Sequence, residues 1–263
     1  MTGLIITIVI SLLLCIGAVI IAGKTAKTDK SKRIWIIVAA CGTVIVHYSS
    51  LIYHGIGHAV APDTITTVFQ FVRSNPNLVL PIYPCNLVMW LCLILAFLPK
   101  KDTKTYRFLV DFCFIFGVAS AFVGMCANGD YFNPNVVKDY DICKSAVAHA
   151  FMLTNILLLP VLGYFKLDTI KNSINVAAGV VLMALVGLLD DAIVAVVGGV
   201  DTMNQYNAMF LWKSPIEAVP FLKFYIVGPI FIVATFGILT LIEIIKFPKG
   251  ERWYSKLSRK NKN

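Results

Sequence analysis

Hydrophobic residues occur along the chain in seven long runs, and polar linkers separate them. The runs cover residues 4–22, 34–57, 78–98, 108–127, 145–165, 175–198 and 223–245. Each run is close to the ~20 residues that a helix needs to cross a bilayer. None of them alternates polar and apolar residues as the strands of a membrane barrel do. The pattern therefore predicts an all-α, polytopic membrane protein with seven transmembrane helices, folded as a single domain over residues 1–263.

The distribution of basic residues predicts the topology. Only 14% of the residues are charged and 58% are hydrophobic, against about 25% charged in a typical soluble domain. A net charge of +9 would suggest nucleic acid as the partner of a soluble protein, but here 18 of the 23 Lys and Arg fall on one side of the predicted bundle. By the positive-inside rule, the N-terminus then lies outside and the C-terminus in the cytoplasm. No basic segment precedes the first run, so it is expected to stay as a helix rather than to act as a signal peptide.

The expected partners follow from this arrangement. We expect a multi-pass protein of the plasma membrane that contacts membrane lipids and no nucleic acid. The tail over residues 246–263 carries seven basic residues, which would lie close to anionic lipid on the cytoplasmic side.

The seven cysteines show no metal-binding pattern. No Cys-x-x-Cys pair occurs and the intervals do not match zinc ligands, so no metal or cofactor is predicted. Cys126 and Cys143 flank an outward linker, where a disulfide is conceivable, although sequence does not fix their separation. Cysteines inside apolar runs usually behave as small hydrophobic residues. Cys85 differs because it follows a proline and precedes an amide.

Several polar residues are predicted at one depth of the bilayer. The topology puts Cys85, His149, His54, Asp190 and Asp191 in the outer part of their runs. Polar and ionisable groups at membrane depth are costly and are candidates for function. Their shared depth predicts a polar chamber in the outer half of the bundle.

Other polar residues have more than one interpretation. His47 and His54 are seven residues apart, so they share a helix face with Ser50 close by, and His58 continues that line. The two histidines either line the chamber or hydrogen-bond a neighbouring helix.

For three acidic residues and one asparagine the sequence gives a single expectation each. Asp190 and Asp191 point about 100° apart on a helix, which predicts that only one of them faces the interior. Asn155 lies deeper and is expected to hydrogen-bond a neighbouring helix. Asp111 is expected to form a local ion pair with Arg107.

The start of the third run decides whether Cys85 is reactive. Pro84 suits the first position of a helix, because it has no N–H and a fixed φ. In that case Cys85 lies in the first turn, where unpaired N–H groups and the helix dipole favour the thiolate. Alternatively, Pro81 and Pro84 kink a longer helix.

A cysteine in such a turn needs further groups to act as a nucleophile. His149 is the histidine of the later runs and would complete a cysteine–histidine pair. Asn86 would orient this histidine or donate a hydrogen bond to an oxyanion, and Tyr83 would donate similarly.

Three segments resemble one known family of integral membrane proteins. The segment Leu80-Pro81-Ile82-Tyr83-Pro84-Cys85-Asn86 is similar to the Leu-Pro-Leu-His-Leu-Cys segment of the YwaF / transmembrane protein 164 family. His149, leading into residues 151–160, resembles the family's histidine-bearing helix. Asn207-Ala208-Met209-Phe210-Leu211, followed by Lys213 and Pro215, resembles its Asn-Tyr-Met-Phe-Leu…Pro element. The order and spacing agree over roughly residues 80–230. The chain departs from the family at Tyr83, Pro84 and Ala208, which replace His, Leu and Tyr and put a third catalytic group in doubt.

The resemblance implies a fatty-acyl transferase that acts on membrane lipids without a cofactor. Carried over, Cys85 is the nucleophile and His149 the base. The candidate substrate-binding residues are His54, Tyr83, Asn86, Asp190, Asp191 and Asn207.

Two other functions are weighed against the acyltransferase. The main alternative is a proton-coupled small-molecule transporter that uses the outer histidines and aspartates as a relay. A retinal-type receptor is disfavoured, because Lys223 and Lys246 lie at the edges of the last run rather than inside it.

Overall fold

The fold is known here from a computed structural model, which describes residues 2–60, 76–98, 103–126, 140–215 and 219–255. Within these ranges the chain is helical and contains no strand. Short 3₁₀ turns lie at Pro76–Leu78, Ala208–Phe210 and Lys249–Glu251. The α-helices of the described ranges are α1 (Thr2–Thr25), α2 (Asp29–Val60), α4 (Pro84–Phe97), α5 (Lys104–Cys126), α6 (Tyr140–Val161), α7 (Thr169–Tyr206) and α8 (Phe224–Lys246).

Six of these helices are long and apolar enough to cross a membrane, and α4 is a shorter apolar helix. This confirms an all-α, polytopic membrane protein. The predicted third span over residues 78–98 is helical only from Pro84 to Phe97. Its 14 residues reach about 21 Å at 1.5 Å per residue, less than the ~30 Å of a bilayer core. Pro81 and Pro84 have no N–H to donate, so the residues before the helix follow an irregular path.

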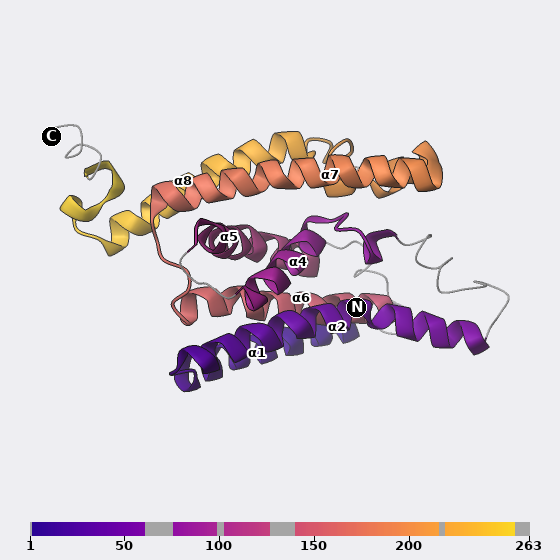
Figure 1. Cartoon of the computed structure of the whole chain (residues 1–263), viewed down its shortest axis with the longest axis horizontal. Coiled ribbons are helices and arrows are strands. Elements are labelled where there is room, and N and C mark those ends of the chain that lie inside the picture. The colour runs from indigo at the N-terminus through magenta and orange to yellow at the C-terminus, as the bar shows by residue number, and fades with distance from the viewer. Residues whose placement is uncertain (1, 61–75, 99–102, 127–139, 216–218, 256–263) are drawn as a thin grey trace.

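The helices pack in layers around α5 and α6. Helix α6 packs against α1, α2 and α5, while α4 lies between α2 and α5. Helices α7 and α8 pack against each other, and α7 covers α5 from the other side (Figure 1). Glycine allows the closest approach: a Cβ added at Gly179 of α7 would lie 2.0 Å from Phe112 Cδ2 of α5. Such contacts between small and large residues let helices pack where lipid supplies no hydrophobic driving force.

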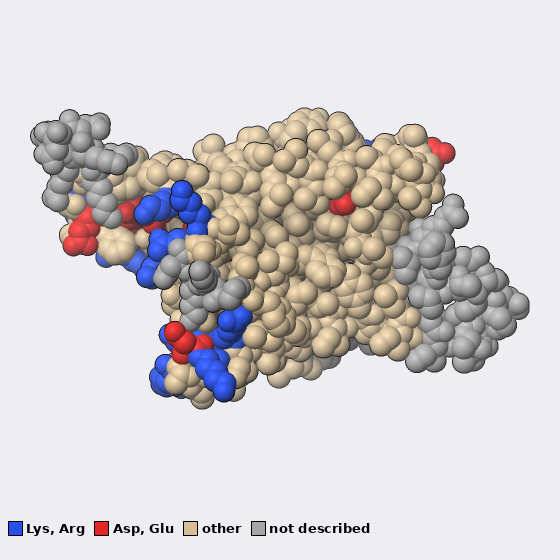
Figure 2. Space-filling model, viewed as in Figure 1, with Lys and Arg blue, Asp and Glu red and all other residues tan. Residues whose placement is uncertain are grey.

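Basic side chains gather at one end of the bundle. The α1–α2 turn, the starts of α5 and α7 and the end of α8 meet at this end (Figure 1). Figure 2 shows the Lys and Arg of the visible face concentrated there, whereas the middle of the bundle is almost without charge. Assignment of this basic end to the cytoplasm follows from the positive-inside rule and stays a prediction.

Buried polar contacts join the layers near the basic half. The Thr169 hydroxyl at the start of α7 donates to Glu243 Oε2 of α8 over 2.5 Å, and both residues are buried. Asp111 is buried as well and accepts a hydrogen bond of 2.7 Å from Asn175 Nδ2 of α7. Asp111 therefore joins α5 to α7, rather than serving only the local contact with Arg107 that the sequence predicted. The expectation for Asn155 is wrong, because its buried amide makes no hydrogen bond within the described residues.

Candidate functional site

Helix α4 begins at Pro84, and Cys85 lies in its first turn. Tyr83 is the N-cap residue with extended φ and ψ of −101° and 152°. The alternative of a longer helix kinked by the two prolines is therefore wrong. The half-buried Cys85 thiol donates to Asn86 Oδ1 over 3.3 Å. Since the first N–H groups of a helix have no carbonyl partner within it, the local field around Cys85 is positive.

Asn86 orients the thiol and ties it to the preceding turn. Its side chain is buried, and Nδ2 donates to the carbonyl oxygen of Asn77 over 2.6 Å. With Nδ2 bound to this carbonyl, Oδ1 faces Cys85. The sequence predicted that Asn86 would act on the histidine or an oxyanion, and these roles stay predictions. Asn77 was not identified from sequence, because a single asparagine before an apolar run carries no pattern.

His149 has one ring nitrogen bound and the other buried. Nδ1 lies 2.7 Å from the carbonyl oxygen of Ser145, one turn earlier on α6. A carbonyl only accepts hydrogen bonds, so this contact assigns the proton of the neutral ring to Nδ1 and leaves a lone pair on Nε2. Nε2 is buried without a hydrogen-bond partner in the described part of the chain. It lies against Gly124 of α5, where an added Cβ would be only 2.2 Å away.

Contacts along α5 place Cys85 and His149 in the same part of the bundle. Val88 of α4 and Ile156 of α6 both lie against Gly117 of α5. Cys85 is three residues before Val88, and His149 is seven before Ile156. Because α4 and α6 both run antiparallel to α5, the two groups lie on the same side of Gly117, offset along the helix axis by about 6 Å. Their direct pairing stays a prediction.

His47 of α2 lies in the same part of the bundle as His149. Its ring is within electrostatic reach of His149 and Lys144 and adjoins the backbone of Asn77. The Nε2 atom of His47 is buried and, like that of His149, has no hydrogen-bond partner among the described residues. Lys144 is held by Asp141, one turn earlier, at 3.3 Å. The Nε2 atoms of His47 on α2 and His149 on α6 are thus both buried without a hydrogen-bond partner among the described residues.

Asp190 and Asp191 are both buried, which overturns the expectation that only one faces the interior. They are 2% and 4% exposed. Asp191 Oδ1 accepts from the Ala208 N–H at 2.9 Å, and its Oδ2 accepts from Trp212 Nε1 at 2.8 Å. Asp190 Oδ2 has no partner within the described residues. Asp191 therefore has a structural role in the loop that follows α7.

Asn207 folds the same loop. Its Oδ1 accepts from the N–H groups of Trp212 and Lys213 at 2.9 and 3.1 Å, and its Nδ2 donates to the Lys213 carbonyl at 2.8 Å. Asn207, Met209 and Phe210 have φ values of 46°, 52° and 56°. Left-handed backbone costs a residue other than glycine about 1–2 kcal/mol. The hydrogen bonds to Asp191 and Asn207 hold this strained loop in place.

The strained loop lies on the residues that lead into α4. The Met209 N–H donates to the Ile82 carbonyl over 2.7 Å. The ring of Phe210 stacks on that of Tyr83, with centroids 5.6 Å apart and planes 23° apart. Segments 80–86 and 207–215, more than 120 residues apart in the chain, are therefore joined in space. Tyr83 serves as a stacking partner here, a role that sequence did not identify.

Some predicted residues lie outside what the structure describes. The side chains of His54, His58 and Cys126 are among them, so their predicted roles and the Cys126–Cys143 disulfide are untested. Within the described ranges, no group of three or more His, Cys, Asp and Glu side chains is suited to a metal ion.

Comparison with known proteins identifies the family. No curated protein and no solved structure matches the chain. Residues 2–242 match the sequence profile of the TMEM164 family. This range includes α1 to α7, nearly all of α8 and the three segments on which the resemblance rests. The chain therefore belongs to the TMEM164 family.

Proposed function

We propose that the protein is a membrane-embedded acyltransferase, with Cys85 as nucleophile and His149 as general base. The observation that carries the proposal is the state of His149. Its Nδ1 is occupied by the Ser145 carbonyl, while the buried Nε2 lone pair has no partner among the described residues. A buried basic nitrogen without a partner is costly, and a proton donor or substrate would satisfy it.

The position of Cys85 supports the same role. The backbone N–H groups of the first turn of α4 lie around Cys85, and Asn86 fixes the orientation of its thiol. The strained loop fixes the residues before α4 through Ile82 and Tyr83. Rigid support of this kind is what a nucleophile requires, because small displacements of reacting groups reduce rates strongly.

The reaction proceeds in two balanced steps. In the first, His149 Nε2 takes the thiol proton as Cys85 Sγ attacks the carbonyl carbon of a lipid acyl ester. The ester C–O bond breaks, and the leaving alkoxide takes the proton from His149, which leaves an acyl thioester on Cys85. In the second step, His149 takes the proton of an acceptor hydroxyl, which attacks the thioester and forms the new ester. The thiolate then recovers the proton from His149.

Intact-mass spectrometry of the protein purified with lipid tests the proposal. We expect the wild type to carry an added acyl chain that hydroxylamine removes, and Cys85→Ala to carry none. Replacing His149 by Gln should lower the rate of thioester formation by about 10²–10⁴-fold, which is the usual contribution of a general base. Cys92→Ala is the matched control, since Cys92 lies in the same helix.

The outcome that overturns the proposal is equally specific. A wild-type protein without a hydroxylamine-sensitive acyl group, together with full lipid acyl transfer by Cys85→Ala, would return both residues to packing roles. Equal loss in Cys85→Ala and Cys92→Ala would show a folding effect rather than a nucleophile.

A proton-coupled transporter is the second candidate, favoured by interrupted helices and a buried aspartate. Helix α4 is short and follows irregular backbone, and α7 is kinked at Gly199, whose φ is 84°. Interrupted helices surround the binding sites of many transporters, and Asp190 has a buried oxygen without a described partner. Uptake in vesicles that fails in Asp190→Asn but survives in Cys85→Ala would favour this function.

We further propose the plasma membrane as its location, with the C-terminus in the cytoplasm. The gathering of basic side chains at one end of the bundle supports this orientation. Membrane lipids would be its partners, with anionic lipid near the tail from residue 246. A protease added to sealed cells should cleave a tag on the N-terminus but spare one on the C-terminus.

A further inference from the structure

Ser120 of α5 carries a buried hydroxyl that has no hydrogen-bond partner among the described residues. A hydroxyl within a helix often donates to the carbonyl oxygen four residues earlier, as the buried Thr43 and Thr154 do here at 2.9 and 2.8 Å. Ser120 makes no such bond. Because a buried donor without an acceptor is costly, an acceptor atom of a bound molecule would stabilise this side chain.

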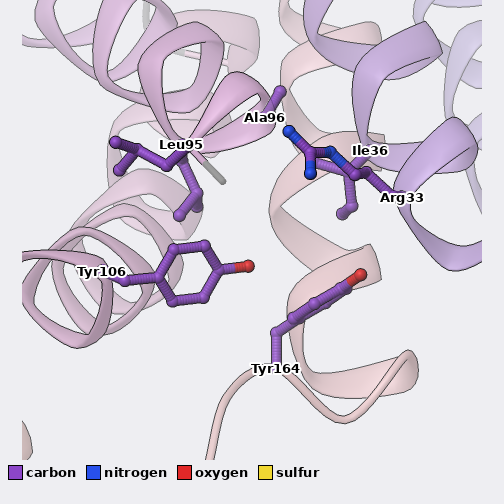
Figure 3. Close-up of a pocket in the computed structure, with 7 residues that line it drawn as sticks. Arg33, Ile36, Leu95, Ala96, Tyr106 and Tyr164 are labelled. Atoms are coloured by element: carbon purple, nitrogen blue, oxygen red, sulfur yellow. The ribbon is translucent and has the colours of Figure 1, made fainter. Parts of the chain in front are cut away.

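Contacts between α4 and α5 give the register of the two helices. Three pairs of residues, one from each helix, lie together in this order: Leu95 with Tyr106, Cys92 with Cys113, and Val88 with Gly117. Figure 3 shows the first pair beside one small gap at the basic end of the bundle. Residue numbers fall along α4 as they rise along α5, so the two helices run antiparallel.

The same register brings Ser120 to the level of Cys85. Cys85 is seven residues before Cys92, and Ser120 is seven residues after Cys113. A step of seven residues is about two turns, so each residue lies on the same helix face as the cysteine from which it is counted. Ser120 therefore lies on the face of α5 that meets α4, across from the proposed nucleophile.

The backbone of Cys85 supplies a second donor at this level. Its N–H is among the first N–H groups of α4, which have no carbonyl partner within the helix. Acyl-transfer enzymes stabilise the oxyanion with such N–H groups and with side-chain donors that are already in place before the reaction. The other nearby side-chain donor, Asn86 Nδ2, already donates to the Asn77 carbonyl.

His149 lies further along the same face of α5. Its Nε2 lies against Gly124, which is four residues after Ser120 and so about 6 Å further along the helix axis. Cys85 and Ser120 thus share one level, and His149 lies one turn beyond them. The Ser120 hydroxyl is closer to the level of the attacking sulfur than the imidazole is, which suits a contact with the acyl carbonyl.

We infer that Ser120 is a catalytic residue of the acyl transfer, an assignment that rests on the proposed function. Its hydroxyl donates to the acyl carbonyl oxygen. As Cys85 Sγ attacks the carbonyl carbon, the π electron pair of the C=O bond moves onto this oxygen, which then accepts hydrogen bonds from Ser120 Oγ and from the Cys85 N–H. When the alkoxide leaves, the electron pair returns and the C=O bond is restored, so Ser120 keeps its proton throughout.

Two rates at Cys85 test this role, both followed by mass spectrometry of the peptide that contains it. The first is acylation by p-nitrophenyl decanoate, which passes through an oxyanion. The second is alkylation by iodoacetamide, a displacement at a saturated carbon that forms no oxyanion. Ser120→Ala should lower the acylation rate by about 10²–10³-fold, as expected for the loss of one oxyanion donor, and should leave the alkylation rate unchanged.

Ser173→Ala is the matched control. The Ser173 hydroxyl is also buried without a partner among the described residues, but it lies near the start of α7, so its removal should change neither rate. If Ser120→Ala does not fold, Ser120→Thr and Ser120→Val replace it, since their side chains have the same shape and differ in the hydroxyl. Ser120→Thr should be acylated at least about tenfold faster than Ser120→Val.

The outcomes separate this role from the acyl transfer itself. A wild type that forms no acyl thioester at Cys85 would overturn the proposed function and the role of Ser120 together. A wild type that forms it, with full-rate acylation of Ser120→Ala, would overturn the role of Ser120 alone. Equal losses of acylation and alkylation in Ser120→Ala, equal acylation of Ser120→Thr and Ser120→Val, or an equal loss in Ser173→Ala would do the same.

Discussion

Replacing Asp191 by Ala should destabilise the protein far more than the same change at Asp190. The two carboxyl groups are neighbours on α7 and equally buried, so helix propensity and burial are matched. They differ in their contacts, since Asp191 accepts two hydrogen bonds from the loop after α7 and Asp190 Oδ2 has no partner within the described residues. The pair of variants therefore isolates the contribution of those two bonds.

The size of the effect follows from the two donors. The Ala208 N–H is fully buried, and a buried donor left without an acceptor costs about 1–3 kcal/mol. Trp212 is 52% exposed, so water can replace its lost acceptor and the cost falls to about 0.5–1 kcal/mol. Asp191→Ala should thus lower the free energy of unfolding by about 1.5–4 kcal/mol. For a chain of this length that corresponds to a fall in Tm of about 3–16 °C.

Thermal unfolding in detergent measures this directly. Asp191→Asn retains one acceptor oxygen and should fall between the wild type and Asp191→Ala. Asp190→Ala should stay within about 1 kcal/mol of the wild type, because it removes a buried carboxyl group with an unsatisfied oxygen. A Tm of Asp191→Ala within 2 °C of the wild type (about 1 kcal/mol or less), or an equal loss in Asp190→Ala, would refute the structural role of Asp191.

Two glycine substitutions extend the predictions to the candidate site and to the helix packing. Gly124→Ala places a Cβ 2.2 Å from His149 Nε2, so the ring must move. The rate of acyl-thioester formation should therefore fall by about tenfold or more. Gly237→Ala is the control, because its Cβ meets open space, and it should leave this rate unchanged. Gly179→Ala places a Cβ 2.0 Å from Phe112 and should lower the free energy of unfolding by about 1–3 kcal/mol. The amount of acyl-thioester per folded molecule should be the same in Gly179→Ala and in the wild type. A lower amount per folded molecule would contradict the view that Gly179 serves only helix packing.

Much of the fold could be predicted from the chain, because lipid imposes strong local rules. A run of about 20 apolar residues must satisfy its backbone hydrogen bonds internally, and a helix does so without help from other segments. The start of α4 at Pro84 was also among the predictions, since proline is restricted by its own covalent geometry. The length of α4 was overestimated. Before Pro84, the N–H groups of Val79 and Leu80 donate to the Pro76 carbonyl, and the Ile82 carbonyl accepts from the loop after α7.

For the candidate site, the sequence predicted which polar residues matter but not what they contact. Sequence identified Cys85, His149 and Asp191 as candidates because polar groups at membrane depth are costly, and the family resemblance added Asn207. It could not assign their partners: Asp191 and Asn207 hold a strained loop, which no pattern of neighbouring residues indicated.

The sequence by itself thus determined the membrane class, the helical runs and the polar residues within them, because each depends on residues close together in the chain. Only the tertiary structure decided what surrounds His149 Nε2, which is buried against Gly124 of α5. It also decided that the loop after α7 supports the start of α4, through a contact between Ile82 and Met209. Such contacts join segments more than 120 residues apart, and their formation depends on how whole helices pack, which no local preference of the chain encodes.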